Sequence, residues 1–123
     1  MSRFILYYQE HARGGRVELR VDDGEWVEVN TRGEDVVDRV RVIDVEDGPH
    51  ELDLRTRGGG ESRLYGVALE REGPGVVYDS LGINGACTTA LGRINQQHLT
   101  EQLNHRKADL IVLAFGANES SRP

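Results

Sequence analysis

The chain has 123 residues, of which 37% are hydrophobic and 29% are charged, and its formal net charge at pH 7 is −6. This length allows one ordinary domain, or one small domain and part of another. The basic residues are scattered and no apolar run approaches the roughly 20 residues that span a bilayer, so we expect neither nucleic acid nor a membrane as a partner. The single cysteine excludes an internal disulfide, and without a recognisable signal peptide the compartment stays undecided.

From residue 4 to about residue 72, apolar and polar residues alternate in short runs such as GRVELRVDD and HELDLRTR. A period of two is typical of half-buried strands, and the runs are separated by glycine-rich turn signals. In RVDDGEWVEV the pattern predicts a hairpin in which Gly24 takes the positive φ of the turn. Six or so short strands without a helical pattern between them predict an antiparallel β-sandwich over residues 1–72.

The pattern changes after Gly73, where we place the boundary of a second part, residues 73–123. GVVYDSLG (75–82) predicts a short strand, and DLIVLAF (109–115) is a continuous apolar run of the kind that a buried parallel strand requires. Between them, leucines and isoleucine recur at helical spacing in residues 86–108. The order predicts one βαβ unit, so the fold class is two-part α+β.

VVYDSLGINGACTTAL, the helix behind it and ADLIVLAFGANE together resemble the second and third sequence blocks of the SGNH (GDSL-type) hydrolases. The resemblance implies a flavodoxin-like α/β domain and serine esterase chemistry without a cofactor. It assigns the oxyanion hole to the backbone N–H of Gly85 and the side chain of Asn118, supported by Gly116 and by Glu119, which stands where most members have Asp. Without the resemblance, Gly85 is a turn glycine before a helix and Asn118 an ordinary loop residue.

RLYGVALEREGPGVVYDSLGINGA resembles the junction in a subgroup of carbohydrate and peptidoglycan O-acetylesterases. In that subgroup a jelly-roll module similar to carbohydrate-binding modules lies between the nucleophile block and the glycine block. The resemblance implies a substrate that is an acetylated carbohydrate or another small ester. It also implies that the Gly-Asp-Ser nucleophile lies upstream of Met1 and that the Asp-x-x-His base lies downstream, so we expect the chain alone to be inactive.

Two short stretches of the chain resemble the nucleophile motif and the Asp-x-x-His motif of the family. Ser80 stands in the letters D-S-L, but Tyr78 occupies the place of the family's glycine and no helix begins directly after it, so we expect a scaffold residue at the strand end. Asp47 and His50 in DGPH match Asp-x-x-His, but Asp-Gly-Pro is turn chemistry and the motif precedes the Asn block. No His, Cys or carboxylate pair has metal-ligand spacing, so we expect no metal.

The aromatic residues of the sandwich define the rival hypothesis, a non-catalytic carbohydrate-binding module. Trp26 and Tyr65, with Tyr7 and Tyr8, are candidates to stack on sugar rings, although most tryptophans in sandwiches are core residues. A third hypothesis is a truncated reading frame without an independent role.

If the family's strand order applies, the strands of 75–82 and 109–115 should flank a first strand that precedes the nucleophile block. We therefore expect the two strands to pair directly or to expose apolar edges, with self-association as the result.

Overall fold

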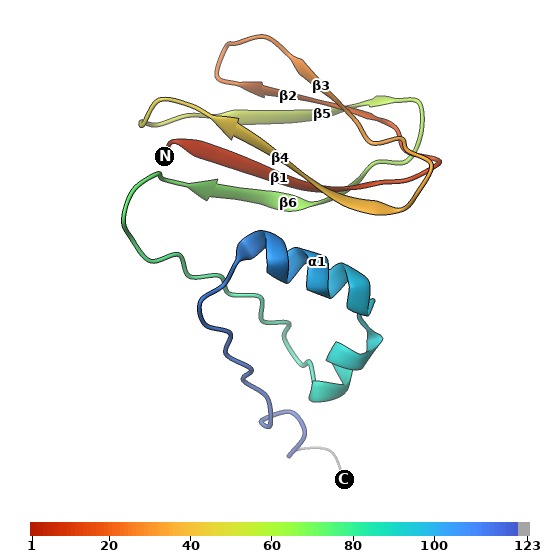
Figure 1. Cartoon of the computed structure of the whole chain (residues 1–123), viewed down its shortest axis with the longest axis vertical. Coiled ribbons are helices and arrows are strands. Elements are labelled where there is room, and N and C mark those ends of the chain that lie inside the picture. Colours follow the sequence, from red (N-terminus) through yellow and green to blue (C-terminus); the bar gives the residue numbers. More distant parts are fainter. Residues whose placement is uncertain (121–123) are drawn as a thin grey trace. The chain divides into compact units, whose positions relative to one another are not determined.

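The computed structural model describes residues 1–120 and divides the chain into two compact units, Met1–Pro74 and Gly75–Pro123. It is mostly antiparallel β-sheet with one short α-helix (Figure 1). The predicted β-rich α+β class is therefore confirmed at this level.

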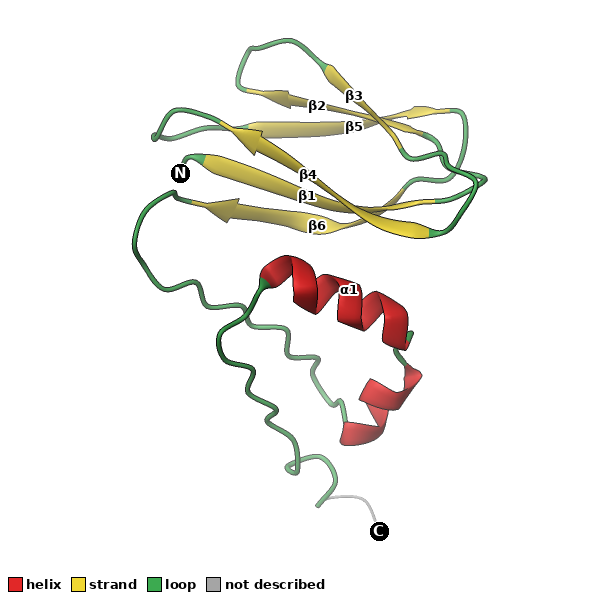
Figure 2. Cartoon of the chain, viewed as in Figure 1, coloured by secondary structure: helices red, strands yellow, loops and turns green. Residues whose placement is uncertain are grey.

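The first unit contains six strands in two layers (Figure 2). One sheet has the order β4-β1-β6 and the other the order β3-β2-β5, and every pairing is antiparallel. The strands are β1 (Arg3–Glu10), β2 (Arg16–Val21), β3 (Val27–Asn30), β4 (Val37–Asp44), β5 (Leu52–Gly58) and β6 (Arg63–Glu70).

The core of this unit is a small apolar cluster between the two sheets. Leu6 of β1, Leu19 of β2 and Val29 of β3 are 0%, 2% and 5% exposed and pack together. Their positions follow the alternation seen in the sequence, since residues two apart on a strand point to the same face. Partly buried side chains from neighbouring strands complete the cluster, namely Tyr8, Ile43, Leu52 and Val67.

The predicted hairpin of β2 and β3 is present, but its turn differs from the expectation. The positive φ falls on Asp22 (51°) and not on Gly24, whose backbone N–H donates to the Val21 carbonyl at 3.1 Å. Aspartate is one of the residues that tolerate this left-handed conformation, and the Asp22 carboxylate is held by a distant segment: Oδ1 accepts from the backbone N–H of Glu51 at 2.9 Å.

The second unit contains a 3₁₀ helix, η1 (Thr88–Arg93), and one α-helix, α1 (Gln96–Arg106). Asn95 caps α1 by accepting from the His98 backbone N–H at 3.0 Å, and Lys107 ends it in a left-handed conformation with φ 49°. The helix predicted over residues 86–108 is therefore present in its second half only.

The two strands predicted in residues 75–82 and 109–115 are absent from the structure, which corrects that part of the prediction. Both segments are irregular, and their large apolar side chains are exposed. A buried parallel strand needs a hydrogen-bonding neighbour and layers on its faces. Within residues 75–120 no such neighbour is present, so apolar composition alone does not produce a strand.

Candidate functional site

Gly85 and Asn118, predicted to share an oxyanion hole, lie in two turns that the structure brings into contact. Gly85 lies in the turn before η1, where the Ala86 backbone N–H donates to the Ile83 carbonyl at 3.1 Å. Asn118 lies in the turn of residues 116–120, which a 3.1 Å bond from the Ser120 N–H to the Gly116 carbonyl closes. The side-chain Nδ2 of Asn118 donates to the Ala86 carbonyl at 2.8 Å, so the two loops meet within one residue of Gly85.

The carboxylate of Glu119 joins the same two loops. Its Oε1 accepts from both the backbone N–H and the Oγ1 hydroxyl of Thr88, each at 2.5 Å. Its Oε2 accepts from the Gly116 N–H at 2.9 Å. The hydrogen bonds from the Thr88 hydroxyl and backbone, the largest causes, together with that from Gly116, lower the pKa of Glu119 to about 2. We call this set, Glu119 with Thr88 and Gly116, the Glu119 bridge.

Glycine is required at both turns because of backbone conformation. Gly85 has a φ of 77° and Gly116 a φ of 115°, in the region that side-chain-bearing residues rarely adopt. A Cβ at either glycine would meet no atom within 4 Å, so steric crowding is not the reason for either. Gly85 is exposed, and its left-handed turn presents backbone without a side chain over it.

From the sequence, Glu119 was assigned a supporting place, but Thr88 as its partner and the Ala86 carbonyl as the partner of Asn118 were missed. The hydroxyl of Thr88, three residues after Gly85, was the available signal, because a Thr at the start of a helical segment offers both a backbone and a side-chain donor. The resemblance implied that the Gly85 and Asn118 loops are adjacent, and only the fold shows that Thr88 and the Ala86 carbonyl make the contacts.

Ser80 has no catalytic partner in the part of the chain that the structure describes. It is exposed in the irregular segment, which corrects its expected place at a strand end, and no hydrogen bond joins it to another described residue. The neighbouring Asp79 accepts from the Arg106 Nε at 2.8 Å. A serine nucleophile needs a base within hydrogen-bond reach, and the contacts of Ser80 provide none.

Asp47 and His50 do not form a catalytic pair. Asp47 is ion-paired with the N-terminal ammonium group and with Arg71. The Nδ1 of His50 contacts Asp22 Oδ2 at 2.8 Å, and its Nε2 contacts the Glu46 carbonyl at 2.7 Å. Two acceptors favour the doubly protonated ring, so the hydrogen bond to Asp22, followed by that to Glu46, raises the pKa of His50. This ring joins two turns of the sandwich and has no nitrogen left to act as a base.

Trp26 is half-buried and covered by cations. It precedes β3 on the side of Glu28, opposite the buried Val29, and therefore lies on the outer face of the β3-β2-β5 sheet. The guanidinium carbons of Arg20 and Arg55 lie 4.7 Å and 3.7 Å from its ring centroid. Cation–π contacts of this kind occupy ring surface that a sugar would need.

Tyr65 on β6 is held through its hydroxyl. The group donates to Asp38 Oδ1 at 2.7 Å and accepts from Gln9 Nε2 at 2.8 Å. Burial, together with the bond to Asp38, raises the pKa of Tyr65. Tyr8 packs against the core cluster, and of the four aromatic candidates Tyr65 is exposed, at 43%, whereas the other three are partly buried.

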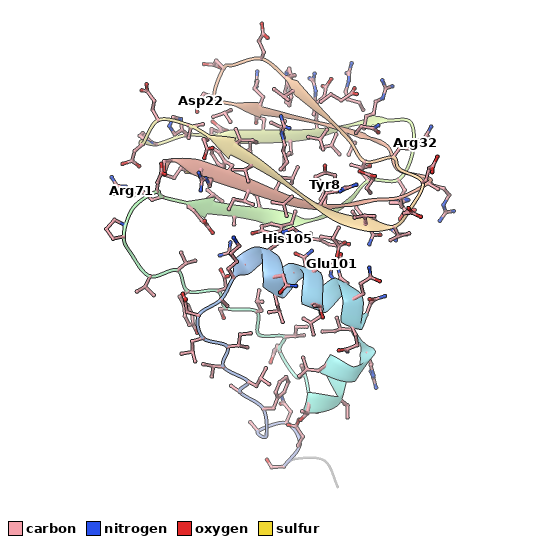
Figure 3. The ribbon with its side chains drawn as sticks, in the orientation of Figure 1. Tyr8, Asp22, Arg32, Arg71, Glu101 and His105 are labelled. Carbon is pink, nitrogen blue, oxygen red and sulfur yellow. The ribbon has the colours of Figure 1, made fainter. Side chains whose placement is uncertain are left out.

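A hollow of about 290 Å³ lies at one end of the sandwich, and none of these aromatic residues lines it. Arg32 is fixed at its edge, with Nε donating to the Gly14 carbonyl at 3.1 Å and Nη2 to the Gly59 carbonyl at 2.6 Å. Figure 3 shows Arg32 and Asp22 at opposite ends of the sandwich. The hollow was not anticipated from the sequence; it is lined by Gly14, Gly15, Arg16, Glu28, Asn30, Arg32 and Gly59.

Other classes of site have no basis in the described residues. Within residues 1–120, no three His, Cys, Asp or Glu side chains form a group that could hold a metal ion. None of the described helices is long and apolar enough to cross a membrane. Cys87, between Ala86 and Thr88, is buried at 8% exposure.

Comparisons of the chain with protein-family models, with curated proteins and with solved structures found no match.

Proposed function

We propose that the chain carries the oxyanion-binding part of an SGNH-type serine esterase that deacetylates an O-acetylated carbohydrate or cell-wall polymer. The observation that carries the proposal is the 2.8 Å contact of Asn118 Nδ2 with the Ala86 carbonyl, beside Gly85. The two motif residues are 33 positions apart in the sequence, and this contact brings the Asn118 side chain within one residue of Gly85.

The chemistry assigned to these residues is stabilisation of a tetrahedral oxyanion. In ester hydrolysis the charge develops on the former carbonyl oxygen, and donors placed in advance lower the barrier because they need not reorganise. Gly85 would offer its backbone N–H, and Asn118 its side-chain NH₂. That NH₂ group carries two hydrogens, so the amide would share or exchange its contact with Ala86 when the oxyanion forms.

In this proposal the nucleophilic serine and the histidine base come from polypeptide outside the 123 residues. The strand preceding that serine would lie between residues 75–82 and 109–115 and pair with both, giving the flavodoxin-like sheet. The exposed apolar side chains of these two segments support this arrangement, because they are the surface that such a strand and its covering helices would bury. The sandwich would then be the inserted jelly-roll-like module.

The proposal is tested in the continuous reading frame that contains this chain. The DNA on both sides should encode Gly-Asp-Ser upstream and Asp-x-x-His downstream, and the product should hydrolyse p-nitrophenyl acetate. In that product, Gly85→Ala tests the backbone donor, and Gly85→Asn is its matched control. Asn tolerates a left-handed φ better than Ala, so the pair separates the effect of loop strain from the effect of lost access to the N–H. A frame without these blocks, or a product without esterase activity, would overturn the proposal.

The second candidate is a carbohydrate-binding sandwich, and the hollow beside Arg32 is the observation that favours it. Its guanidinium and amide donors and the Glu28 carboxylate suit hydroxyl groups of a sugar. Calorimetric titration of the chain with acetylated xylo-oligosaccharides tests it: saturable binding that is lost in Arg32→Ala but kept in Tyr65→Phe supports binding at the hollow, and no saturable binding excludes it.

A further inference from the structure

The carboxylate of Glu119 is the one group in the second unit's described contacts that holds donors from both functional loops at once. We propose that Glu119 is a positioning residue that fixes the Gly85 loop against the Asn118 loop, so that both oxyanion donors are in place before a substrate binds. The inference rests on the proposed function and adds to it a residue that does not itself touch the substrate.

The geometry divides the two carboxylate oxygens between the two loops. Oε1 takes both donors of Thr88, 31 residues away, and Oε2 takes the Gly116 N–H, three residues away. Because a carboxylate is rigid and planar, its two oxygens cannot move independently. The Thr88 and Gly116 backbones are thereby kept at a fixed separation.

The bridge lies directly beside the contact that carries the functional proposal. Glu119 follows Asn118 in the chain, and Thr88 lies two residues after Ala86, the partner of the Asn118 amide. The neighbouring side chains of Asn118 and Glu119 therefore make two neighbouring contacts between the same two loops. If the Asn118 amide exchanges its contact with Ala86 for a substrate oxygen, the Glu119 bridge still holds the loops together.

The bridge depends on charge as well as on shape. All three partners are N–H or O–H donors, and a carboxylate accepts with both oxygens. Glutamine has the same length but only one acceptor oxygen, so its NH₂ group would face either Thr88 or Gly116, donor against donor. Charge-assisted hydrogen bonds are also shorter and stronger than neutral ones, in keeping with the 2.5 Å contacts and with the low pKa of Glu119.

The test is NMR spectroscopy of the 123-residue chain at neutral pH with Glu119→Gln. We expect hydrogen exchange of the Thr88 and Gly116 amides to speed up about tenfold or more, as for loss of a hydrogen bond of about 1.4 kcal/mol. We also expect the Gly85 amide and Asn118 side-chain signals to shift or broaden, and the proximity of Asn118 Nδ2–H to Ala86 to be lost. Glu101→Gln is the matched control, because its carboxylate accepts from Gln97 within α1 and joins no loops.

A milder pair of variants covers the case in which Glu119→Gln disrupts the unit. Thr88→Val removes only the hydroxyl donor, whereas Thr88→Ser keeps it. The proposal requires that the NMR signals of the Gly85 amide and the Asn118 side chain change in Thr88→Val and stay unchanged in Thr88→Ser. If Thr88 and Gly116 respond to Glu119→Gln while Gly85 and Asn118 do not, Glu119 merely caps η1 and the proposal is overturned. No response at any of the four residues overturns it as well.

The failure of this inference can be told from failure of the proposed function. The NMR result requires no turnover, so the bridge can be demonstrated even if the continuous frame has no esterase activity, in which case the function alone fails. In an active frame, Glu119→Gln should lower kcat with little change in KM, and Glu119→Asp should restore part of it. An active enzyme whose kcat is unaffected by Glu119→Gln refutes the positioning role alone.

Discussion

The exposed apolar run of residues 110–113 leads to a prediction of self-association. Leu110, Ile111, Val112 and Leu113 are 79%, 55%, 75% and 68% exposed, and their backbone has no strand partner among the described residues. An extended apolar segment with free backbone groups pairs readily with a second copy of itself. A symmetric pair places the same segment on both sides of the interface.

The magnitude follows from the exposed fractions. Burying a large apolar side chain completely contributes about 1.5 to 3 kcal/mol, so covering what these four expose contributes about 4 to 8 kcal/mol per chain, or about 8 to 16 kcal/mol for two. Association costs about 4 to 15 kcal/mol in lost freedom. The difference between these ranges runs from about 7 kcal/mol against pairing to about 12 kcal/mol in its favour. A balance of about 4 to 8 kcal/mol, within that span, corresponds to a dissociation constant of about 1 mM to 1 μM, and this is the range that the experiment covers.

Val112→Asp is the sharpest perturbation, because the side chain is 75% exposed and a charge there must be desolvated on pairing. Losing its contribution in both copies removes about 2 to 4 kcal/mol, so the dissociation constant should rise about 30- to 1000-fold. Val36→Asp, at a 65% exposed valine of the first unit, is the control and should leave association unchanged. Sedimentation velocity from about 5 to 500 μM measures it, and a wild-type chain that stays monomeric throughout refutes the reasoning.

Three further predictions concern stability and activity. Leu19→Ala should lower the free energy of unfolding by about 2 to 5 kcal/mol, read from urea titrations by the fluorescence of Trp26, the only tryptophan, and a change under 1 kcal/mol would contradict the core assignment. Because the pKa of His50 is raised, its contribution to stability is complete below about pH 6.5 and is lost as the pH rises through the folded-state pKa. The urea midpoint measured from about pH 5 to 9 should show this decline, and His50→Gln should flatten the pH dependence. Ser80→Ala should leave any hydrolysis of p-nitrophenyl acetate unchanged, and a loss of turnover would show that the serine reacts.

The strands of the sandwich were predictable because their information is local. The alternation around Leu6, Leu19 and Val29 gives each strand one inward face, and the glycine-rich turns separate the strands. Which residue takes the strained turn position was not predictable. Asp22 adopts it because of partners from the connection between β4 and β5, and no local pattern shows those partners.

In the second unit, local sequence was not enough to predict the strands. The apolar runs at Val76 and at Ile111 have the composition of buried strands, but a strand forms only against a hydrogen-bonding neighbour, and the sequence of one segment cannot supply it. The resemblance to the SGNH sequence blocks implied that Gly85 and Asn118 lie close together, and the fold adds the Ala86 carbonyl through which their loops meet. The charged contacts of Glu119 could not be foreseen from spacing, because its partners come from both a neighbouring turn and a distant one.

The most direct test of the central claim, that Asn118 is an oxyanion donor, is kcat for acetyl ester hydrolysis by the continuous reading frame with Asn118→Ala. Removing one such donor commonly costs a factor of about 10² to 10³ in kcat, and we predict a loss in that range with KM nearly unchanged. A kcat within about threefold of the unaltered protein would contradict the account.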